Sequence, residues 1–255
     1  MNTPVLLICF NRPKHVHRVL TEIRKQQPVD VFIAQDGPRE GTWLAPDGRM
    51  LRKDDYEQIM AVRQVINELV DWKCNLHILY QKHNLGCGPG PAAGINWFFS
   101  QVERGIVMED DCLAHPDFFG YCEELLVRYQ DDEQVQFINA TLYHNNWHCE
   151  ASYGFSHYMV TGAWAAWRRS WQGFDLDLHS LNARKFRRQV YSLTDNRVEA
   201  DWWYYKVIEI QQDKEKKSYW DYQMQILLFL HNALTIHPAV NLISNIGFDA
   251  AGTHT

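Results

Sequence analysis

The first 140 residues alternate between short apolar runs and stretches with the spacing of an amphipathic helix. Residues 5–10 form a continuous apolar run, as expected of a strand covered on both faces, and Pro13 then opens a helix. The apolar positions of that helix fall on one face: Val16, Val19, Leu20 and Ile23. Further strands are expected at residues 29–34, 76–80, 106–108 and 135–140, with helices between them. This alternation predicts an α/β fold with a mostly parallel central sheet and helices on both faces.

The pattern is looser from residue 141 onward. It predicts a strand near residues 155–160 and helices at 198–211 and 219–232. The Gly- and Pro-bearing loop of residues 37–53 is long for a compact domain, which suggests a functional flap. We expect a single domain over residues 1–255, with one lobe at 1–140 and a second at 141–255.

Composition and charge exclude several classes of function. The chain has 255 residues and a formal net charge of -6, without the basic stripe that nucleic-acid binding would need. Its apolar runs fall well short of the roughly 18 residues needed to span a bilayer. The six cysteines include no C-x-x-C pair, so we expect reduced thiols. These features predict a cytoplasmic protein; peripheral contact with the inner face of the membrane stays open.

Four polar clusters directly follow the expected strands of the first lobe. They are Asn11-Arg12, Gln35-Asp36, His83-Asn84 and the triplet Glu109-Asp110-Asp111. In open α/β sheets, ligands bind beyond the carboxyl ends of the strands. These clusters are therefore the candidate binding residues.

The triplet after a buried strand is costly through mutual repulsion unless a cation or strong hydrogen bonds compensate it. Oxygen ligands alone favour Mg²⁺ or Mn²⁺, held by one or two carboxylates while substrate phosphates complete the shell. The alternative is that these acids cap the following helix or lie in solvent.

The triplet region, "MEDDCLAHPDFFGYCEELLVRY", resembles that of GT-A glycosyltransferases, notably the animal N-acetylglucosaminyltransferase I group. The chain looks still more like bacterial nucleotide-diphospho-sugar transferase-like proteins, some of them labelled hemolytic protein-like. In those proteins "HNLGCG", "EDDC", "GAWAAWRRSW" and "NLISNIGF…THT" recur in this order. The resemblance spans nearly the whole chain. It implies a GT-A fold with a nucleotide-binding lobe at 1–140 and an acceptor-side lobe at 141–255.

The resemblance also implies roles for the clusters. Arg12 would contact the nucleotide base or ribose, Asp36 would face the uracil ring, and His83 and Asn84 are weaker nucleotide candidates. Asp111 would be the main metal ligand and His254 would complete the metal shell. Glu109 and Asp110 would orient the ribose, metal waters or donor sugar. For Arg12 and Asp36 the alternatives are a solvent-facing helix-entry residue and a turn residue, and for His254 the alternative is a place in a disordered tail.

Inversion at the anomeric carbon would require a general base for the acceptor hydroxyl. Asp221, in "YWDYQM", resembles the base-containing segment of N-acetylglucosaminyltransferase I with a one-residue offset, and Asp201 is the alternative. The other interpretation of each is an exposed helix carboxylate. Gly162, Trp164 and Trp167 would line the donor-sugar and acceptor cleft, with core packing as the other interpretation of the tryptophans.

The resulting hypothesis is a metal-dependent transferase of polysaccharide biosynthesis that moves a sugar from a UDP-linked donor to a glycan or glycolipid hydroxyl. One alternative is a sugar-phosphate nucleotidyltransferase, although "CFNRPKH" lacks the usual glycine-rich loop. The other is a non-catalytic nucleotide-sugar- or glycan-binding relative.

Overall fold

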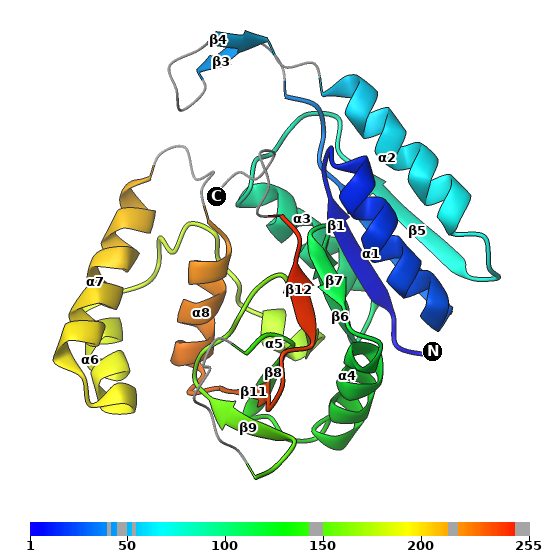
Figure 1. Cartoon of the computed structure of the whole chain (residues 1–255). Helices are drawn as coiled ribbons and strands as arrows, with labels where there is room; N and C mark the ends of the chain where they lie inside the picture. Colours follow the sequence, from blue (N-terminus) through cyan, green and yellow to red (C-terminus); the bar gives the residue numbers. More distant parts are fainter. Residues whose placement is uncertain (40–41, 45–49, 53–54, 143–149, 214–218, 248–255) are drawn as a thin grey trace.

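The chain folds around one eight-stranded sheet, seen in a computed structural model that describes residues 1–39, 42–44, 50–52, 55–142, 150–213 and 219–247 (Figure 1). The strand order is β5-β2-β1-β6-β10-β8-β11-β9. The first four strands are parallel neighbours: β1 (Val5–Cys9), β2 (Asp30–Gln35), β5 (Asn75–Tyr80) and β6 (Arg104–Glu109). The others are β8 (Val135–Asn139), β9 (Tyr153–Ser156), β10 (Ala163–Trp167) and β11 (Leu234–Pro238).

Helices cover both faces of this sheet, as the sequence predicts. One face packs against α1 (Pro13–Gln26), α2 (Tyr56–Leu69) and α4 (Asp117–Arg128). The opposite face packs against α3 (Pro89–Gln101), the short α5 (Arg168–Trp171) and α8 (Asp221–Leu230). The predicted apolar face of α1 is confirmed, since Val16, Val19, Leu20 and Ile23 are fully buried. The fold is therefore α/β, with a large sheet between two helical layers.

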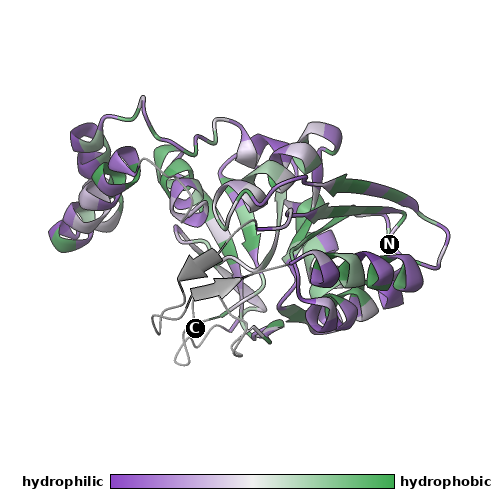
Figure 2. Ribbon diagram, turned by 90° about the horizontal axis from the view of Figure 1, so that it is seen from above, coloured by the Kyte–Doolittle hydropathy of each residue, from purple (hydrophilic) through white to green (hydrophobic). Residues whose placement is uncertain are grey.

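A third core lies beside the sheet. It joins α6 (Ala183–Thr194) and α7 (Arg197–Gln212) to the far side of α8, through buried residues that include Phe186, Val207 and Phe229. Seen from above, the α6–α7 pair stands at the opposite end of the molecule from α1 and the N-terminus (Figure 2). None of the described helices is long and apolar enough to cross a membrane.

Two small two-stranded sheets complete the structure. The strand β7 (Cys112–Ala114) directly follows the acidic triplet and pairs with β12 (Ile243–Asn245). The strands β3 (Thr42–Leu44) and β4 (Met50–Arg52) pair within the loop expected to form a flap. The β7–β12 pair therefore brings the end of the described chain against the triplet.

The position of β10 differs from the sequence expectation. Gly162, Trp164 and Trp167 were expected to line a cleft, with core packing as the other interpretation of the tryptophans. Residues 163–167 form a buried central strand, antiparallel to both β6 and β8. The run AWAAW is continuously apolar, and its three alanines let the two flanking helical layers approach the sheet closely. As a result β8 does not neighbour β6, although it follows β6 in the sequence.

Candidate functional site

The four polar clusters lie at one edge of the sheet. Because β5, β2, β1 and β6 are adjacent and parallel, their carboxyl ends meet at the same edge. Each of these ends is followed by one of the clusters predicted from the sequence. The structure therefore brings together Arg12, Asp36, Asn84 and the acidic triplet.

Arg12 holds two acids of the triplet. Its Nη1 donates to Asp111 Oδ2 at 3.1 Å, and its Nη2 pairs with Asp110 Oδ1. Asp110 is only 3% exposed and also accepts a hydrogen bond from the Phe10 backbone N–H at 3.3 Å. Burial by itself would lower the pKa of Arg12, but Asp110 and Asp111 raise it above its usual range. Arg12 is therefore a permanent cation that partly compensates the triplet.

Glu109 is not compensated in this way. Burial, followed by the charges of Asp111, Asp110 and Asp221, raises the pKa of Glu109 to about 8. Asp221 belongs to the first turn of α8, so a carboxylate from a distant segment also lies near Glu109. The cluster thus contains four carboxyl groups and one guanidinium, which gives it an excess of acidic groups.

That excess suits a divalent cation, although the protein supplies few ligands for one. Within the described ranges, no group of three or more His, Cys, Asp or Glu side chains is arranged to hold a metal ion. Arg12 already engages Asp110 and Asp111, so substrate phosphates or water would have to complete the shell. His254, the other expected ligand, lies outside the described residues.

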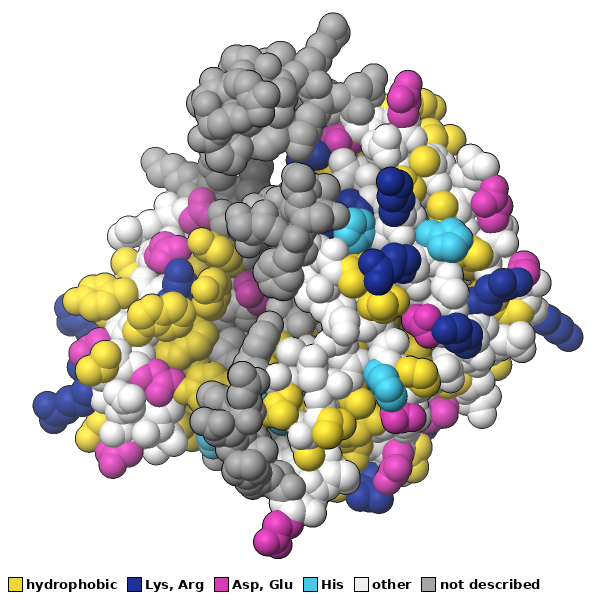
Figure 3. Space-filling model, viewed as in Figure 1, with side chains coloured by type: hydrophobic (Ala, Val, Ile, Leu, Met, Phe, Trp, Pro, Cys, Tyr) yellow, Lys and Arg dark blue, Asp and Glu magenta, His cyan; other side chains and the backbone are white. Residues whose placement is uncertain are grey.

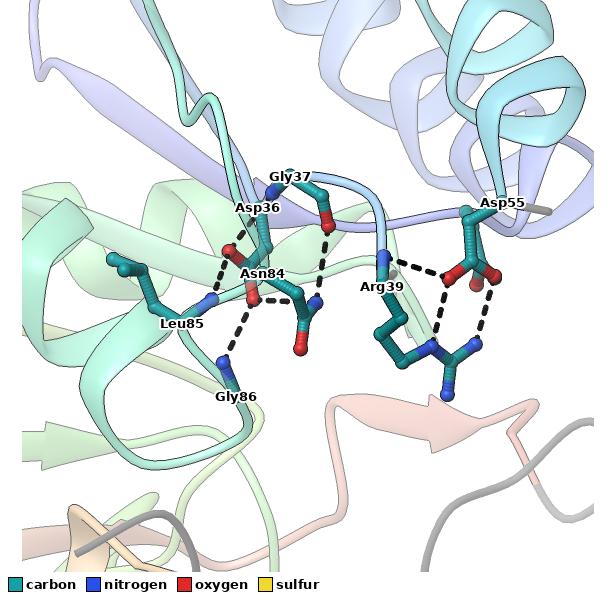
Figure 4. A network of polar contacts seen from close by, with 8 residues as sticks. Asp36, Gly37, Arg39, Asp55, Asn84, Leu85 and Gly86 are labelled. Atoms are coloured by element: carbon teal, nitrogen blue, oxygen red, sulfur yellow. Dashed lines mark hydrogen bonds and ion pairs between the residues drawn. The ribbon is translucent and has the colours of Figure 1, made fainter. Parts of the chain in front are cut away.

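Asp36 organises the loop between β5 and α3 (Figure 4). Its Oδ1 accepts from the backbone N–H groups of Gly37 and Leu85, at 2.8 and 2.9 Å. Its Oδ2 accepts from Asn84 Nδ2 and the Gly86 N–H, at 3.0 and 3.1 Å. A carboxylate has about four lone-pair sites, and all four are used here. This favours a loop-positioning role for Asp36 over the expected contact with uracil.

The two weaker nucleotide candidates, His83 and Asn84, have different surroundings. Asn84 Nδ2 donates to Gly37 O at 3.1 Å as well as to Asp36, so it too holds the loop. His83 is exposed and stands at the same edge. A Cβ at Gly37 would lie 2.5 Å from the His83 carbonyl carbon, so only glycine permits this close approach of two backbones.

The sequence interpretation missed a second polar network beside the first (Figure 4). Asp55, 4% exposed at the start of α2, accepts from Arg39 Nε at 2.8 Å and Arg39 Nη2 at 2.9 Å. It also accepts from Asn11 Nδ2 at 2.7 Å. The Arg39 guanidinium lies over the Phe10 ring, 4.8 Å from its centroid. The only signal in the sequence was an aspartate just before a helical pattern, which ordinarily indicates a cap.

Of the residues expected to line the cleft, Gly162 lies at the site, whereas Trp164 and Trp167 lie in the core. Gly162 has φ +102°, and its carbonyl accepts from the Glu109 N–H at 2.7 Å, so it supports the triplet through the backbone. Trp164 and Trp167 are 0% and 4% exposed, in cores on opposite faces of the sheet. Successive side chains of a strand alternate between faces, so β10 sends the two tryptophans into helical layers on opposite faces of the sheet, as the core-packing interpretation expects.

The two candidate bases also differ in position. Asp221 is close enough to Glu109 to raise its pKa. Asp201 is instead paired with Arg187 across the α6–α7 interface, and this pairing lowers its pKa. The geometry therefore favours Asp221 over Asp201.

Comparison with known proteins identifies no family. No family model matches the chain, and no curated protein matches it. Among solved structures, the chain is similar to S. aureus TarS residues 1–349, with 14% identity and a TM-score of 0.42, over 68% of this chain and 48% of that one. It is similar to apo UDP-glucose pyrophosphorylase, with 12% identity and a TM-score of 0.38, over 68% of this chain and 79% of that one. It is also similar to HddC from Yersinia pseudotuberculosis, with 11% identity and a TM-score of 0.38, over 68% of this chain and 80% of that one. At these levels of similarity, function must be inferred from the residues of the site.

Proposed function

We propose that the chain is a GT-A glycosyltransferase, which transfers a sugar from a UDP-linked donor to a glycan or glycolipid hydroxyl with inversion at the anomeric carbon. The supporting observation is the acidic cluster at the carboxyl edge of four parallel strands. There Glu109, Asp110 and Asp111 lie beside one cation, Arg12, and one carboxylate from a distant helix, Asp221.

In this proposal the triplet and Arg12 together form the diphosphate end of the site. Asp111 and Glu109 would hold Mg²⁺ or Mn²⁺, which when bound would neutralise the departing diphosphate. Arg12 stays protonated at any physiological pH and adds a fixed positive charge at the same place. Asp110 is buried and fixes the guanidinium through its ion pair.

Asp221 would act on the acceptor. It lies partly exposed in the first turn of α8, close to Glu109. From there its carboxylate could accept the proton of the attacking hydroxyl while the sugar–phosphate bond breaks. Asp36 and Asn84 would act indirectly, by holding the loop that borders the nucleotide.

The test is a thermal-shift and calorimetry series with UDP, GDP, CDP and dTDP, each with and without Mn²⁺. A ligand that binds the native state raises its melting temperature, and we expect this for UDP with Mn²⁺ alone. Asp111→Asn should abolish the metal-dependent part of the shift. The exposed Asp131→Asn is the matched control and should behave as the parent. An unchanged affinity of Asp111→Asn for UDP and Mn²⁺ would exclude Asp111 as the ligand.

One observation favours a second candidate, a non-catalytic nucleotide-sugar-binding relative. Arg12 already compensates Asp110 and Asp111, and the described residues contain no three-membered ligand group. Such a protein would bind the nucleotide equally well without metal and would neither transfer nor hydrolyse the donor sugar. The calorimetry series and a donor-hydrolysis assay separate the two candidates.

A further inference from the structure

The helix α6 is strongly basic in a chain that is acidic overall. It contains Arg184, Lys185, Arg187 and Arg188 and no acidic residue, whereas the whole chain has a net charge of -6. Arg184, Arg188 and Tyr191 recur at intervals of four and three residues, so they share one face of the helix. All three are exposed.

Apart from Arg187, which pairs with Asp201 on α7, the charges of α6 do not stabilise the hairpin that contains them. Arg184 and Lys185 lie in the first turn of α6 and Arg197 opens α7, where the helix dipole disfavours a positive charge. Of the described acidic side chains, none pairs with Arg184, Lys185 or Arg188. The hairpin is instead held by its apolar core, in which Phe186 and Val190 are buried.

A hollow of about 360 Å³ opens between the two helices on this face. It is lined by Arg187, Arg188, Tyr191, Arg197 and Ala200. Asp201 pairs with Arg187 and is also close enough to Arg197 for its pKa to be lowered. Three arginines thus line the hollow and only Arg187 is paired with a carboxylate, which leaves the hollow suited to an oxyanion such as a phosphate diester.

Apolar side chains border the hollow on the solvent side of α7. Val198 is 80% exposed, Tyr205 68% and Tyr191, on α6, 39%. Figure 3 shows hydrophobic side chains gathered over α7, with Lys and Arg side chains at that edge of the molecule. Arginines beside exposed aromatic and aliphatic groups are the combination that binds the interface of an anionic bilayer.

We propose that the α6–α7 hairpin docks the protein on anionic phospholipid membranes, with headgroup phosphates in the arginine-lined hollow and Val198, Tyr191 and Tyr205 at the headgroup level. The rest of the acidic chain is repelled by such a surface. The basic hairpin is attracted, and screening limits both effects to about 10 Å at 0.1 M salt. The hairpin therefore sets the orientation as well as the affinity.

The experiment measures co-sedimentation of the full chain with vesicles of phosphatidylcholine alone and of equal parts phosphatidylcholine and phosphatidylglycerol. The test variant combines Arg184→Ala, Arg188→Ala and Arg197→Ala. The control combines Arg18→Ala with Lys73→Ala, two exposed cations outside the hairpin. We expect binding to the anionic vesicles alone, weakened by about fivefold for each hairpin arginine removed and little changed in the control. Val198→Ser should also weaken binding to the anionic vesicles. Binding by this variant should still fall as salt is added, because the arginines are unchanged.

Melting temperature distinguishes this role from a structural one. Arg184 and Arg197 oppose a helix dipole, and Arg188 has no acidic partner among the described residues. Arg197, however, is also attracted to Asp201 and lies over the Tyr191 ring. Because these effects offset one another, the triple variant should melt close to the temperature of the parent. Equal binding by the parent and the triple variant would overturn the proposal. So would binding to polyglutamate without binding to the anionic vesicles, which would indicate an acidic protein segment as the partner.

Discussion

At the scale of single residues, Glu109 has an unusual protonation state. In the unfolded chain its pKa is near 4.5, whereas in the folded chain burial and then Asp111, Asp110 and Asp221 raise it to about 8. Between these two values the folded chain retains a proton that the unfolded chain releases. The free energy of unfolding therefore falls as pH rises through this window.

We predict that Glu109→Gln removes this dependence, because the amide cannot ionise. Relative to the parent, the variant should gain stability as pH rises from 4.5 to 8, by no more than about 1.4 kcal/mol per pH unit. Urea unfolding at several pH values measures the difference. The exposed Glu57→Gln is the control. A Glu109→Gln difference that stays constant across the window would contradict the raised pKa.

At the scale of elements, two glycines show how the same substitution has opposite effects. A Cβ at Gly37 would meet the His83 backbone at 2.5 Å, and backbone cannot move aside as a flexible side chain can. At Gly120, within α4, a Cβ would have nothing within 4 Å. The first glycine is required by the contact between two loops, whereas the second weakens a helix.

We therefore predict that Gly37→Ala destabilises the protein by about 1–3 kcal/mol, in the range of overpacking, and weakens UDP binding because it displaces the loop that Asp36 holds. Gly120→Ala should instead stabilise it by roughly 0.5–1 kcal/mol, without changing binding. Chemical denaturation and UDP calorimetry on both variants provide the measurement. A Gly37→Ala protein with parental stability and affinity would show that the loop can shift freely.

At the scale of the whole molecule, the sheet takes strands from both halves of the chain. The strand β8 is hydrogen-bonded to β10 and β11, and β6 is hydrogen-bonded to β10. A fragment of residues 1–142 would retain β6 and β8 without these partners. It would also lack Asp221.

We predict that this fragment shows no cooperative thermal transition, because its sheet would be left with unpaired strand edges and an uncovered face. A chain of residues 1–247 retains every described element and should melt cooperatively. Circular dichroism and calorimetry compare the two. Cooperative melting of the fragment would mean that the lobes fold independently, against the expected single domain. The 1–247 chain also tests His254, whose removal should weaken Mn²⁺-dependent UDP binding.

Local sequence signals were sufficient for most elements of the first 140 residues. The run at 5–10, the helix after Pro13 and the polar clusters that follow strands all have a short-range cause: apolar periodicity and residues that break strands. These signals also predicted that the clusters would meet at one edge, since parallel strands end together. The sequence left both a cleft and the core open for the tryptophans of β10, because a short apolar run does not indicate which strands it will pair with.

What the sequence by itself determined is therefore the alternation of strands and helices and the position of the acidic triplet after β6. Only the tertiary structure decided that β10 separates β6 from β8 and that Asp221 lies near Glu109. It also decided that the carboxylate of Asp36 accepts hydrogen bonds from the loop that contains Gly86. Strand order and side-chain partners depend on packing between segments far apart in the chain. The charge balance of the site follows from that packing, because burial and neighbouring charges set each pKa.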